Sequence, residues 1–215
     1  PLPLEIIPLY FELDGTFPNH EANPLDPANL VDLQRAVVEH GADLGLAFDG
    51  DADRCFVVDE RGEPVSPSAI TGLVASRAIA KEVAAGVPVG EVHIVHNVIS
   101  SLAVPELIVA RGAVPVRTRV GHSFIKAEMA SAGAVFGGEH SAHYYFREFW
   151  FADTGMLAAL HVLAAQPGVA QHAAVLVLCA GRRGEQLQCA AGALGARAGV
   201  GVGALPCELA LAVVA

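Results

Sequence analysis

GLAFDGDADRCFVVDERG, residues 45–62, carries an aspartate at every second position of a loop that joins two apolar runs. The runs LGLAF and CFVV are short and uncharged, which predicts a strand on each side of the loop. Asp49, Asp51 and Asp53 then follow the end of the first strand. Three carboxylates this close repel one another, and a hard divalent cation such as Mg²⁺, which prefers oxygen ligands, relieves the repulsion. The stretch therefore predicts a metal loop, and Arg54 adds a positive charge that can hold a phosphate beside the metal.

Three other interpretations of this loop make different demands on the sequence. A solvated acidic turn gives no reason for aspartates at every second position directly behind a buried strand. An EF-hand fits the three aspartates and Glu60, but Arg54 stands where glycine is needed, and the flanks are predicted strands rather than helices. A haloacid-dehalogenase-like phosphatase, with Asp49 as nucleophile and Asp51 as acid, lacks the threonine that follows in that family. A metal loop of another kind fits the residues better.

Short apolar runs alternate with amphipathic stretches along most of the chain, which predicts an α/β fold with mixed, mostly parallel sheets flanked by helices. Strands are expected at residues 4–10, 44–48, 54–59, 92–98 and 113–118, with a strand and loop at 134–140 and a hairpin-like segment at 143–151. Helices are expected at residues 29–41, 66–85, 101–112, 122–133 and 154–165. Leu30, Leu33, Val37 and Val38 are expected to share one face of the first helix, and Asp153 is expected to cap the last one.

The alternating pattern falls into two units that meet near Glu63 and Pro64. Residues 1–63 carry fewer strands than such a unit normally has, so this first unit is expected to be incomplete. Residues 64–165 carry a full set of helices and strands. Residues 166–215 are rich in Ala and Gly and lack Asp, Asn, Ser, Thr and Lys, so they are expected to form a tail outside both units.

Composition excludes several classes of partner. Thirteen basic residues against 23 acidic ones give a net charge of -10, without a basic cluster, so neither a nucleic acid nor an anionic membrane surface is expected as a partner. Residues 154–181 carry no charge, but polar interruptions leave no run of about 20 apolar residues that could cross a membrane. The 4 cysteines show no CxxC spacing, and the start of the chain does not resemble a signal peptide, which favours a cytoplasmic protein.

The stretch GGEHSAHYYF, residues 137–146, places a carboxylate, a hydroxyl and an imidazole in a loop behind an apolar run. Glu139 could accept the hydrogens of two vicinal sugar hydroxyls, and Ser141 could donate or accept beside it. An ordinary polar loop, with His143 bonded to a backbone carbonyl, remains an equal alternative for this stretch taken alone.

The stretch TRVGHSFIKAEM, residues 118–129, places Gly121 and His122 at the start of a helix and Lys126 one turn later. The amino end of a helix together with a lysine suits a phosphate group. Without its neighbouring motifs, however, a solvated helix face is the more common explanation of such a lysine.

FDGDADR resembles the metal loop of the α-D-phosphohexomutases, the family of phosphomannomutases and phosphoglucomutases. LDGTFPNHEANPLDPANL upstream, and TRVGHSFIKAEM, GGEHSAHYYF and FADTGMLAALHVL downstream, stand in the order and approximate spacing of that family. The resemblance covers roughly residues 1–165, as the end of the family's second domain and all of its third, and leaves out the tail at 166–215.

The resemblance implies an isomerase of carbohydrate metabolism that moves a phosphoryl group between O1 and O6 of a hexose, through a bisphosphorylated intermediate. Its partners would be mannose or glucose 1- and 6-phosphates and the 1,6-bisphosphate. It implies these residue roles: Mg²⁺ ligands Asp49, Asp51 and Asp53; catalytic residues Arg54, Lys126 and His143; substrate-binding residues Gly121, His122, Glu139 and Ser141, the last two at the sugar's 3- and 4-hydroxyls. Ala142 stands where the family commonly has glycine.

The family's phosphoryl donor is a phosphoserine in a Thr-Ala-Ser-His-Asn-Pro type stretch, which these 215 residues do not contain. The family's Arg-Ser-Asn-Thr phosphate clamp is also missing from them. The chain alone is therefore expected to have little or no mutase activity. The alternative is a non-catalytic remnant or a module that binds metal and sugar phosphate.

Overall fold

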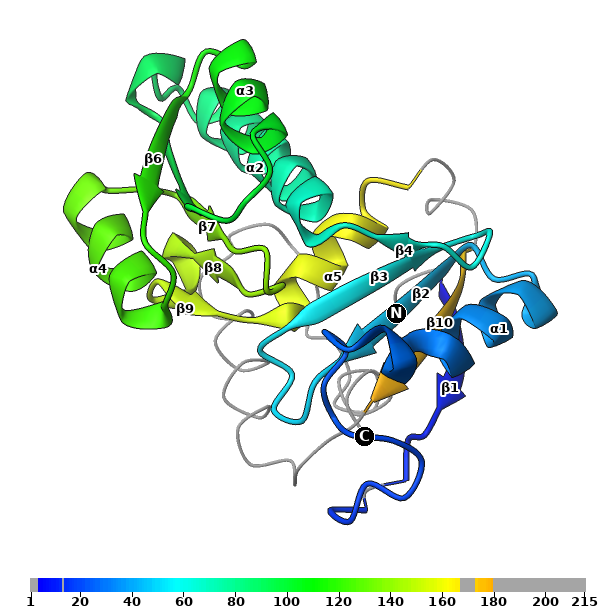
Figure 1. The fold of residues 1–215 in the computed structure, drawn as a ribbon. Helices are drawn as coiled ribbons and strands as arrows, with labels where there is room; N and C mark the ends of the chain where they lie inside the picture. The colour runs from blue at the N-terminus through cyan, green and yellow to red at the C-terminus, as the bar shows by residue number, and fades with distance from the viewer. Residues whose placement is uncertain (1–3, 13, 167–172, 180–215) are drawn as a thin grey trace. The chain divides into compact units, whose positions relative to one another are not determined.

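The computed structural model describes residues 4–12, 14–166 and 173–179, which form two five-stranded sheets with flanking helices (Figure 1). The described residues separate into two compact units. The first contains the chain up to Ala52, Val58–Glu63 and residues 173–179, and the second contains Asp53–Val57 and Pro64–Gln166. The predicted α/β class, with mixed and mostly parallel sheets, is confirmed.

The first sheet has the strand order β1-β10-β2-β3-β4. Its strands are β1 Leu4–Leu9, β10 Ala173–Cys179, β2 Leu44–Phe48, β3 Cys55–Asp59 and β4 Pro64–Val65. β10 pairs in parallel with both β1 and β2. Every residue of β2 is buried, as expected for a parallel strand that is covered on both faces. The predicted strands on both sides of the aspartate loop are therefore present, which argues against an EF-hand.

Strand β10 is an element that the sequence analysis does not predict, because it lies in the segment 166–215 that is expected to be a tail. In register, Val175 pairs with both Ile6 and Leu44. The composition of the whole segment hides a local signal, since AAVLVLC is an unbroken apolar run of the kind that forms central parallel strands.

Helix α1 packs its apolar stripe on β2. The helices of this part are the 3₁₀ helix Pro27–Leu30 and α1 Val31–His40. Leu33 and Val37 are fully buried, whereas Val38, also expected on the same face, is 58% exposed. Val38 lies about 100° around the helix from Val37, outside the stripe that α1 buries. A Cβ at Gly45 would lie 2.7 Å from Val37 Cγ2, so the close approach of α1 requires glycine in β2.

The second sheet has the strand order β6-β5-β7-β8-β9. Its strands are β5 His93–Asn97, β6 Val114–Thr118, β7 Phe136–Gly138, β8 Tyr144–Phe146 and β9 Ala152–Asp153. The helices around it are α2 Pro67–Ala84, α3 Ala103–Ala110, α4 His122–Ala132 and α5 Gly155–Leu163, with short 3₁₀ helices at Val89–Glu91 and Arg147–Phe149. β5, β6 and β7 run parallel, while β8 and β9 are antiparallel.

Crossover connections place helices on both faces of this second sheet. Figure 1 shows α2 and α3 together on one side of β6 and β7, and α4 on the other. This follows from right-handed crossovers, because the chain moves from β5 outward to β6 through α3 and then returns to β7 through α4. Ile125 and Met129 of α4 pack with Val95 and Tyr145 in the core. The parallel strands thus end at one edge, where their following loops meet.

The hairpin from β8 to β9 turns through two residues in left-handed backbone conformation, Trp150 at φ 55° and Phe151 at φ 58°. It places Asp153 opposite Tyr145 in register. The prediction that Asp153 caps α5 is wrong, because Thr154 occupies the cap position and Asp153 ends β9. Asp153 is held instead by the sheet pairing and by side chains of α4.

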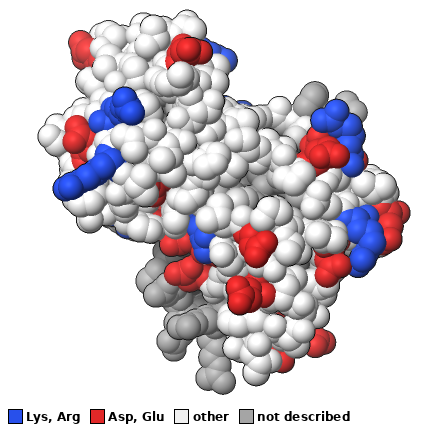
Figure 2. All heavy atoms as spheres, in the orientation of Figure 1, with Lys and Arg blue, Asp and Glu red and all other residues white. Residues whose placement is uncertain are grey.

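In the described part of the chain, the longest apolar helices fall short of the length and hydropathy that a membrane span requires. On the face drawn in Figure 2, the Lys and Arg side chains of the described residues lie singly or beside Asp and Glu, without a continuous basic patch. The absence of nucleic-acid and membrane partners stays a prediction.

Candidate functional site

The carboxyl edge of the second sheet gathers most of the predicted site residues. β5 ends at Asn97, β6 leads through Gly121 into α4, and β7 is followed directly by Glu139. Because these parallel strands end together, residues more than 40 positions apart in sequence come within hydrogen-bonding distance.

Glu139 lies at the centre of this edge and is 1% exposed. Its Oε1 accepts hydrogen bonds from Asn97 Nδ2 at 3.0 Å and from the Gly121 backbone N–H at 3.3 Å. Its Oε2 accepts one from the Tyr145 hydroxyl at 2.8 Å. Burial, followed by the Glu139 charge, raises the pKa of Tyr145 far above its usual value, so this hydroxyl keeps its proton and donates. No local sequence signal indicates the supporting roles of Asn97 and Tyr145.

Ser141 and His143 form the more accessible part of the same loop. Ser141 Oγ lies 2.9 Å from His143 Nδ1, and the opposite nitrogen, Nε2, lies 3.5 Å from Asp53 Oδ1. Glu139 Oε2 is 3.7 Å from His143 Nδ1. Burial, helped by neighbouring His122, lowers the pKa of His143, so its ring is neutral near pH 7 and can donate from one nitrogen and accept at the other. The structure therefore brings Asp53, Ser141 and His143 together.

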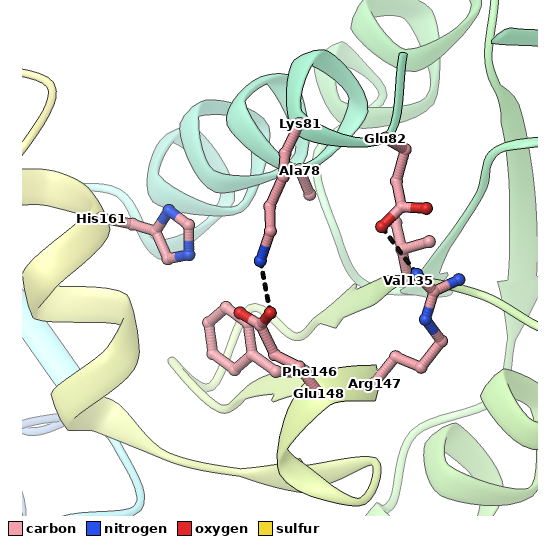
Figure 3. Close-up of a pocket in the computed structure, with 8 residues that line it drawn as sticks. All are labelled: Ala78, Lys81, Glu82, Val135, Phe146, Arg147, Glu148 and His161. Atoms are coloured by element: carbon pink, nitrogen blue, oxygen red, sulfur yellow. Dashed lines mark hydrogen bonds and ion pairs between the residues drawn. The ribbon is translucent and has the colours of Figure 1, made fainter. Parts of the chain in front are cut away.

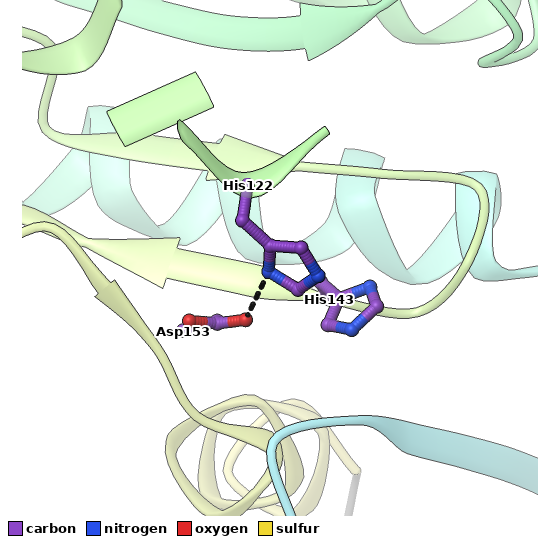
Figure 4. A group of neighbouring side chains, drawn as sticks. All are labelled: His122, His143 and Asp153. Carbon is purple, nitrogen blue, oxygen red and sulfur yellow. Dashed lines mark hydrogen bonds and ion pairs between the residues drawn. The ribbon is translucent and has the colours of Figure 1, made fainter. Parts of the chain in front are cut away.

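Asp153 contacts two of the predicted residues from α4, and Figure 4 shows its contact with His122. Its Oδ1 lies 3.0 Å from Lys126 Nζ, and its Oδ2 lies 3.0 Å from His122 Nδ1, while its own side chain is only 7% exposed. The Tyr145 hydroxyl is also 3.0 Å from His122 Nδ1. Burial acts to raise the pKa of Asp153, but the hydrogen bond from Lys126, a backbone hydrogen bond and the charges of Lys126 and His122 together hold the pKa below its usual value. Asp153 is thus a buried anion beside two potential cations.

The aspartate loop offers three carboxylates whose ligand oxygens lie within 4.8 Å of one another. Asp49 is buried at the end of β2, Asp51 is exposed and Asp53 is half-buried. A backbone hydrogen bond of 3.1 Å from Ala52 N to Asp49 O closes the turn, with Ala52 at φ 58°. Three hard oxygen donors with an open, exposed side fit Mg²⁺, which keeps water or phosphate in its remaining positions.

The start of β3 is joined to the Glu139–His143 loop through the backbone. Arg54 and His143 form an isolated β-bridge, and Cys55 N donates to Ala142 O at 3.2 Å. Arg54 therefore lies beside His143, although 89 positions separate them in sequence. Sequence order alone does not indicate this contact.

Ala142 adopts a left-handed backbone at φ 68° and is completely buried. Glycine would relieve about 1–2 kcal/mol of backbone strain there, but it would lose a buried methyl and gain freedom in the unfolded chain, so these effects nearly cancel.

We expect Ala142→Val to lower the free energy of unfolding by about 1–3 kcal/mol, because a β-branched residue tolerates positive φ poorly and Ala142 is completely buried. Ala142→Gly is expected to stay within about 1 kcal/mol of the wild type. Urea unfolding followed by circular dichroism measures both variants. Equal stability of the valine and glycine variants would contradict the assigned backbone conformation.

A separate pocket lies at the opposite edge of the second sheet (Figure 3). Val135 precedes β7, and Arg147 follows the antiparallel strand β8, which places both at the edge away from Glu139. Lys81 pairs with Glu148, and Arg147 Nη2 lies 2.6 Å from Glu82 Oε1. The pocket is lined by Ala78, Lys81, Glu82, Val135, Phe146, Arg147, Glu148 and His161. Its charges neutralise one another, so it favours no charged ligand.

His161 stacks on Phe146 in this pocket, with ring planes 3° apart and centroids 5.5 Å apart. Burial, with Arg77 adding a like charge, lowers the pKa of His161 from 6.5 to about 4. Between these two values the unfolded chain binds more protons than the folded one, so the stability that neutral His161 supplies is lost as pH falls through this window.

We expect the wild type to lose free energy of unfolding between pH 7 and pH 5 as the unfolded chain takes up the His161 proton. In His161→Phe this loss should be about 1–2 kcal/mol smaller. Urea unfolding at the two pH values measures the difference, and His40→Phe, at an exposed position, is the control. An identical fall in wild type and His161→Phe would show that the folded chain protonates His161 as readily as the unfolded chain.

Comparisons with known proteins agree with this arrangement. The family model described as phosphoglucomutase/phosphomannomutase, alpha/beta/alpha domain II, matches residues 2–62, and the corresponding domain III model matches residues 67–177. The second match extends into β10, beyond the region in which the sequence analysis notes a resemblance.

Relatives from several bacteria align with most of the chain. A phosphomannomutase of Vibrio cholerae is 44% identical over 156 residues, covering 73% of this chain and 32% of the relative. A protein of Xanthomonas campestris named phosphohexose mutases is 45% identical over 156 residues, with 73% and 33% coverage. An Escherichia coli phosphomannomutase is 42% identical over 160 residues, with 74% and 34% coverage. The chain thus spans about a third of the length of these relatives.

Solved structures share the fold. A phosphoglucomutase/phosphomannomutase family protein from Burkholderia thailandensis superposes with a TM-score of 0.67 at 30% identity, covering 73% of this chain and 33% of its own. The open form of a Paramecium phosphoglucomutase, parafusin, reaches a TM-score of 0.52 at 24% identity over 67% of this chain and 25% of its own, which shows likeness of fold alone. Because the domain III model by itself matches more than half of the residues, the chain belongs to the phosphoglucomutase/phosphomannomutase family.

Proposed function

We propose that this chain supplies the metal-binding and sugar-binding parts of a phosphomannomutase or phosphoglucomutase, an isomerase that moves a phosphoryl group between O1 and O6 of a hexose phosphate. The observation that carries the proposal is the junction of Arg54 with His143. It brings a loop suited to metal and phosphate against a loop suited to sugar hydroxyls. The names of the bacterial relatives support the same activity.

The aspartate loop is the proposed metal site, with Asp49, Asp51 and Asp53 as ligands. A bound Mg²⁺ would neutralise charge on a phosphoryl group at the loop. Arg54 would hold a phosphate oxygen there through its guanidinium, whose fork of N–H donors matches phosphate geometry. The exposure of Asp51 leaves room for a phosphate oxygen from the substrate.

The carboxyl edge of the second sheet is the proposed sugar-phosphate site. Lys126 and His122, with the Gly121 backbone at the start of α4, would bind the phosphate that does not react. Ser141 would bind a hydroxyl of the hexose, and His143 would take or give the proton of the reacting hydroxyl.

Glu139 is proposed to bind the sugar's 3- or 4-hydroxyl beside Ser141. Each of its carboxylate oxygens can accept two hydrogen bonds. Its burial means that a hydroxyl must replace or join the donors already present, Tyr145 and Gly121 among them. Mannose, glucose or their bisphosphate would satisfy this site equally well by chemistry.

The phosphoryl donor is not among these residues, since the sequence contains no phosphoserine stretch of the family's type. We therefore propose that the 215 residues alone turn over little substrate, in a cytoplasmic setting. The same observation favours a second candidate, a module that binds metal and sugar phosphate without catalysis.

A coupled mutase assay on the purified chain tests the proposal, with Mg²⁺, mannose 1-phosphate or glucose 1-phosphate, and a catalytic amount of the hexose 1,6-bisphosphate. We expect no turnover but Mg²⁺-dependent binding of sugar phosphate. Turnover abolished by Asp51→Asn would show that the chain holds its own phosphoryl donor. If neither Mg²⁺ nor sugar phosphate binds to the chain, both candidate functions are contradicted.

A further inference from the structure

A second group of potential metal ligands lies within the described residues, formed by His122, His143 and Asp153 (Figure 4). One ligand atom from each lies within 4.8 Å of the others. The three come from separate elements: His122 begins α4, His143 precedes β8, and Asp153 ends β9. Their arrangement is therefore fixed by the sheet and by the packing of α4 rather than by one flexible loop.

The spacing of these atoms suits a single ion. His122 Nδ1 and Asp153 Oδ2 are 3.0 Å apart, close to the edge of about 3.3 Å expected of a tetrahedron with bonds of about 2.0 Å. The rings of His122 and His143 meet edge to face, with centroids 4.3 Å apart. An ion would replace the proton that His122 and Asp153 share, and a small rotation of either ring would complete the contact with His143.

Two further carboxylates lie close to His143, while Lys126 is a positive charge on the far side of Asp153. Asp53 Oδ1 lies 3.5 Å from one nitrogen of His143, and Glu139 Oε2 lies 3.7 Å from the other. Lys126 binds the far oxygen of Asp153, Oδ1, and leaves Oδ2 toward His122. A ligating carboxylate whose second oxygen accepts a hydrogen bond is the usual support of protein metal sites.

The donor set separates this site from the aspartate loop. Two imidazoles and one carboxylate suit borderline ions such as Zn²⁺ or Co²⁺, whereas three carboxylates alone suit Mg²⁺. Three protein ligands leave a fourth position for water or an anion. We propose that His122, His143 and Asp153 form a binding site for a divalent transition-metal ion, distinct from the aspartate loop.

Visible absorption of Co²⁺ tests this site, since a tetrahedral cobalt site with nitrogen and oxygen ligands absorbs strongly while hydrated Co²⁺ does not. The whole chain is titrated with Co²⁺ in excess Mg²⁺, which occupies the aspartate loop. We expect one absorbing Co²⁺ per chain, removed by a chelator. Co²⁺ affinity should fall by at least about tenfold in each of the variants His122→Gln, His143→Gln and Asp153→Asn. This is a lower bound, because the loss of a residue that only supports a metal ligand already lowers metal affinity by about tenfold.

Matched controls locate the ion. His140→Gln removes an imidazole from the same loop, one whose Nδ1 lies 3.1 Å from Ser68 Oγ rather than near Asp153. Asp51→Asn weakens the aspartate loop. Neither should change the cobalt absorption. His122 is half exposed, so His122→Gln should fold even if the variants at His143 and Asp153 do not. Circular dichroism checks the folding of each variant.

Three results would overturn the proposal. The first is cobalt absorption that persists in His122→Gln. The second is absorption that disappears in Asp51→Asn, which would place the ion in the aspartate loop. The third is a near-ultraviolet charge-transfer band, which would identify a cysteine thiolate as the ligand.

The metal site shares His122 and His143 with the proposed sugar-phosphate site, so we expect the two ligands to exclude each other. This consequence rests on the proposed function, whereas the cobalt titration does not. Loss of the absorption on adding mannose 1-phosphate supports it. Unchanged absorption, combined with sugar phosphate binding to the metal-free chain, overturns the exclusion. Absence of sugar phosphate binding to the metal-free chain counts against the proposed function alone.

Discussion

Glu139→Ala is expected to lower the free energy of unfolding of the second unit by about 3–5 kcal/mol. The substitution removes a buried carboxylate, leaves the Asn97 amide and the Gly121 backbone N–H without this acceptor, and leaves the Tyr145 hydroxyl with His122 Nδ1 as a neighbour. Each abandoned buried donor costs about 1–3 kcal/mol, and the vacated volume adds to the loss. Urea unfolding followed by circular dichroism measures the change.

Tyr145→Phe provides the matched comparison for this prediction. It removes one hydrogen bond to Glu139 and keeps the ring in the core, so a smaller loss of about 1–2 kcal/mol is expected. In the double variant the two effects should not add, because both act through the same contact. Full additivity, or a Glu139→Ala variant as stable as the wild type, would contradict the central position given to this carboxylate.

Asp51→Asn is expected to weaken Mg²⁺ binding by about 100-fold or more, because even residues that merely support metal ligands contribute about 10- to 100-fold. Asp51 is the exposed member of the aspartate loop, so the change should leave folding intact. Isothermal titration of the whole chain with Mg²⁺ measures the affinity, and circular dichroism checks the fold.

Glu60→Gln is the control for the metal prediction. Glu60 would be a ligand in an EF-hand, but it lies beyond β3 and outside the group of three aspartates. It should therefore leave Mg²⁺ affinity unchanged. A loss of affinity in Glu60→Gln equal to that in Asp51→Asn would restore the EF-hand interpretation and remove the proposed one.

Local signals were sufficient for much of the fold. The two apolar runs around the aspartate loop became β2 and β3, and the start of α4 fell at His122 as the sequence predicts. Such signals depend on neighbours within a few residues, which is why periodicity detects them. Strand β10 escaped detection because a parallel strand receives its partners from distant segments, here β1 and β2.

The contacts that organise the site were harder to predict. Asp153 is predicted to cap a helix because it directly precedes the expected helix at residues 154–165. Its actual partners, Lys126 and His122, lie 27 and 31 positions away in sequence. Tyr145 packs its ring in the core, as its residue type favours, while its hydroxyl donates to Glu139, a partner that its residue type does not indicate. Both roles follow from the register between β8 and β9, which no pattern within either strand determines.

The bridge between Arg54 and His143, with the hydrogen bond from Cys55 to Ala142, joins the backbone at the start of β3 to the Glu139–His143 loop, and from this link we expect the proposed cation and sugar-phosphate sites to be coupled. A ligand that restrains the Glu139–His143 loop would then also restrain the backbone where the aspartate loop enters β3, so the entropy of restraining both would be lost only once. Such coupling is reciprocal. If a sugar phosphate multiplies the affinity of the aspartate loop for Mg²⁺ by some factor, Mg²⁺ multiplies the affinity for the sugar phosphate by the same factor.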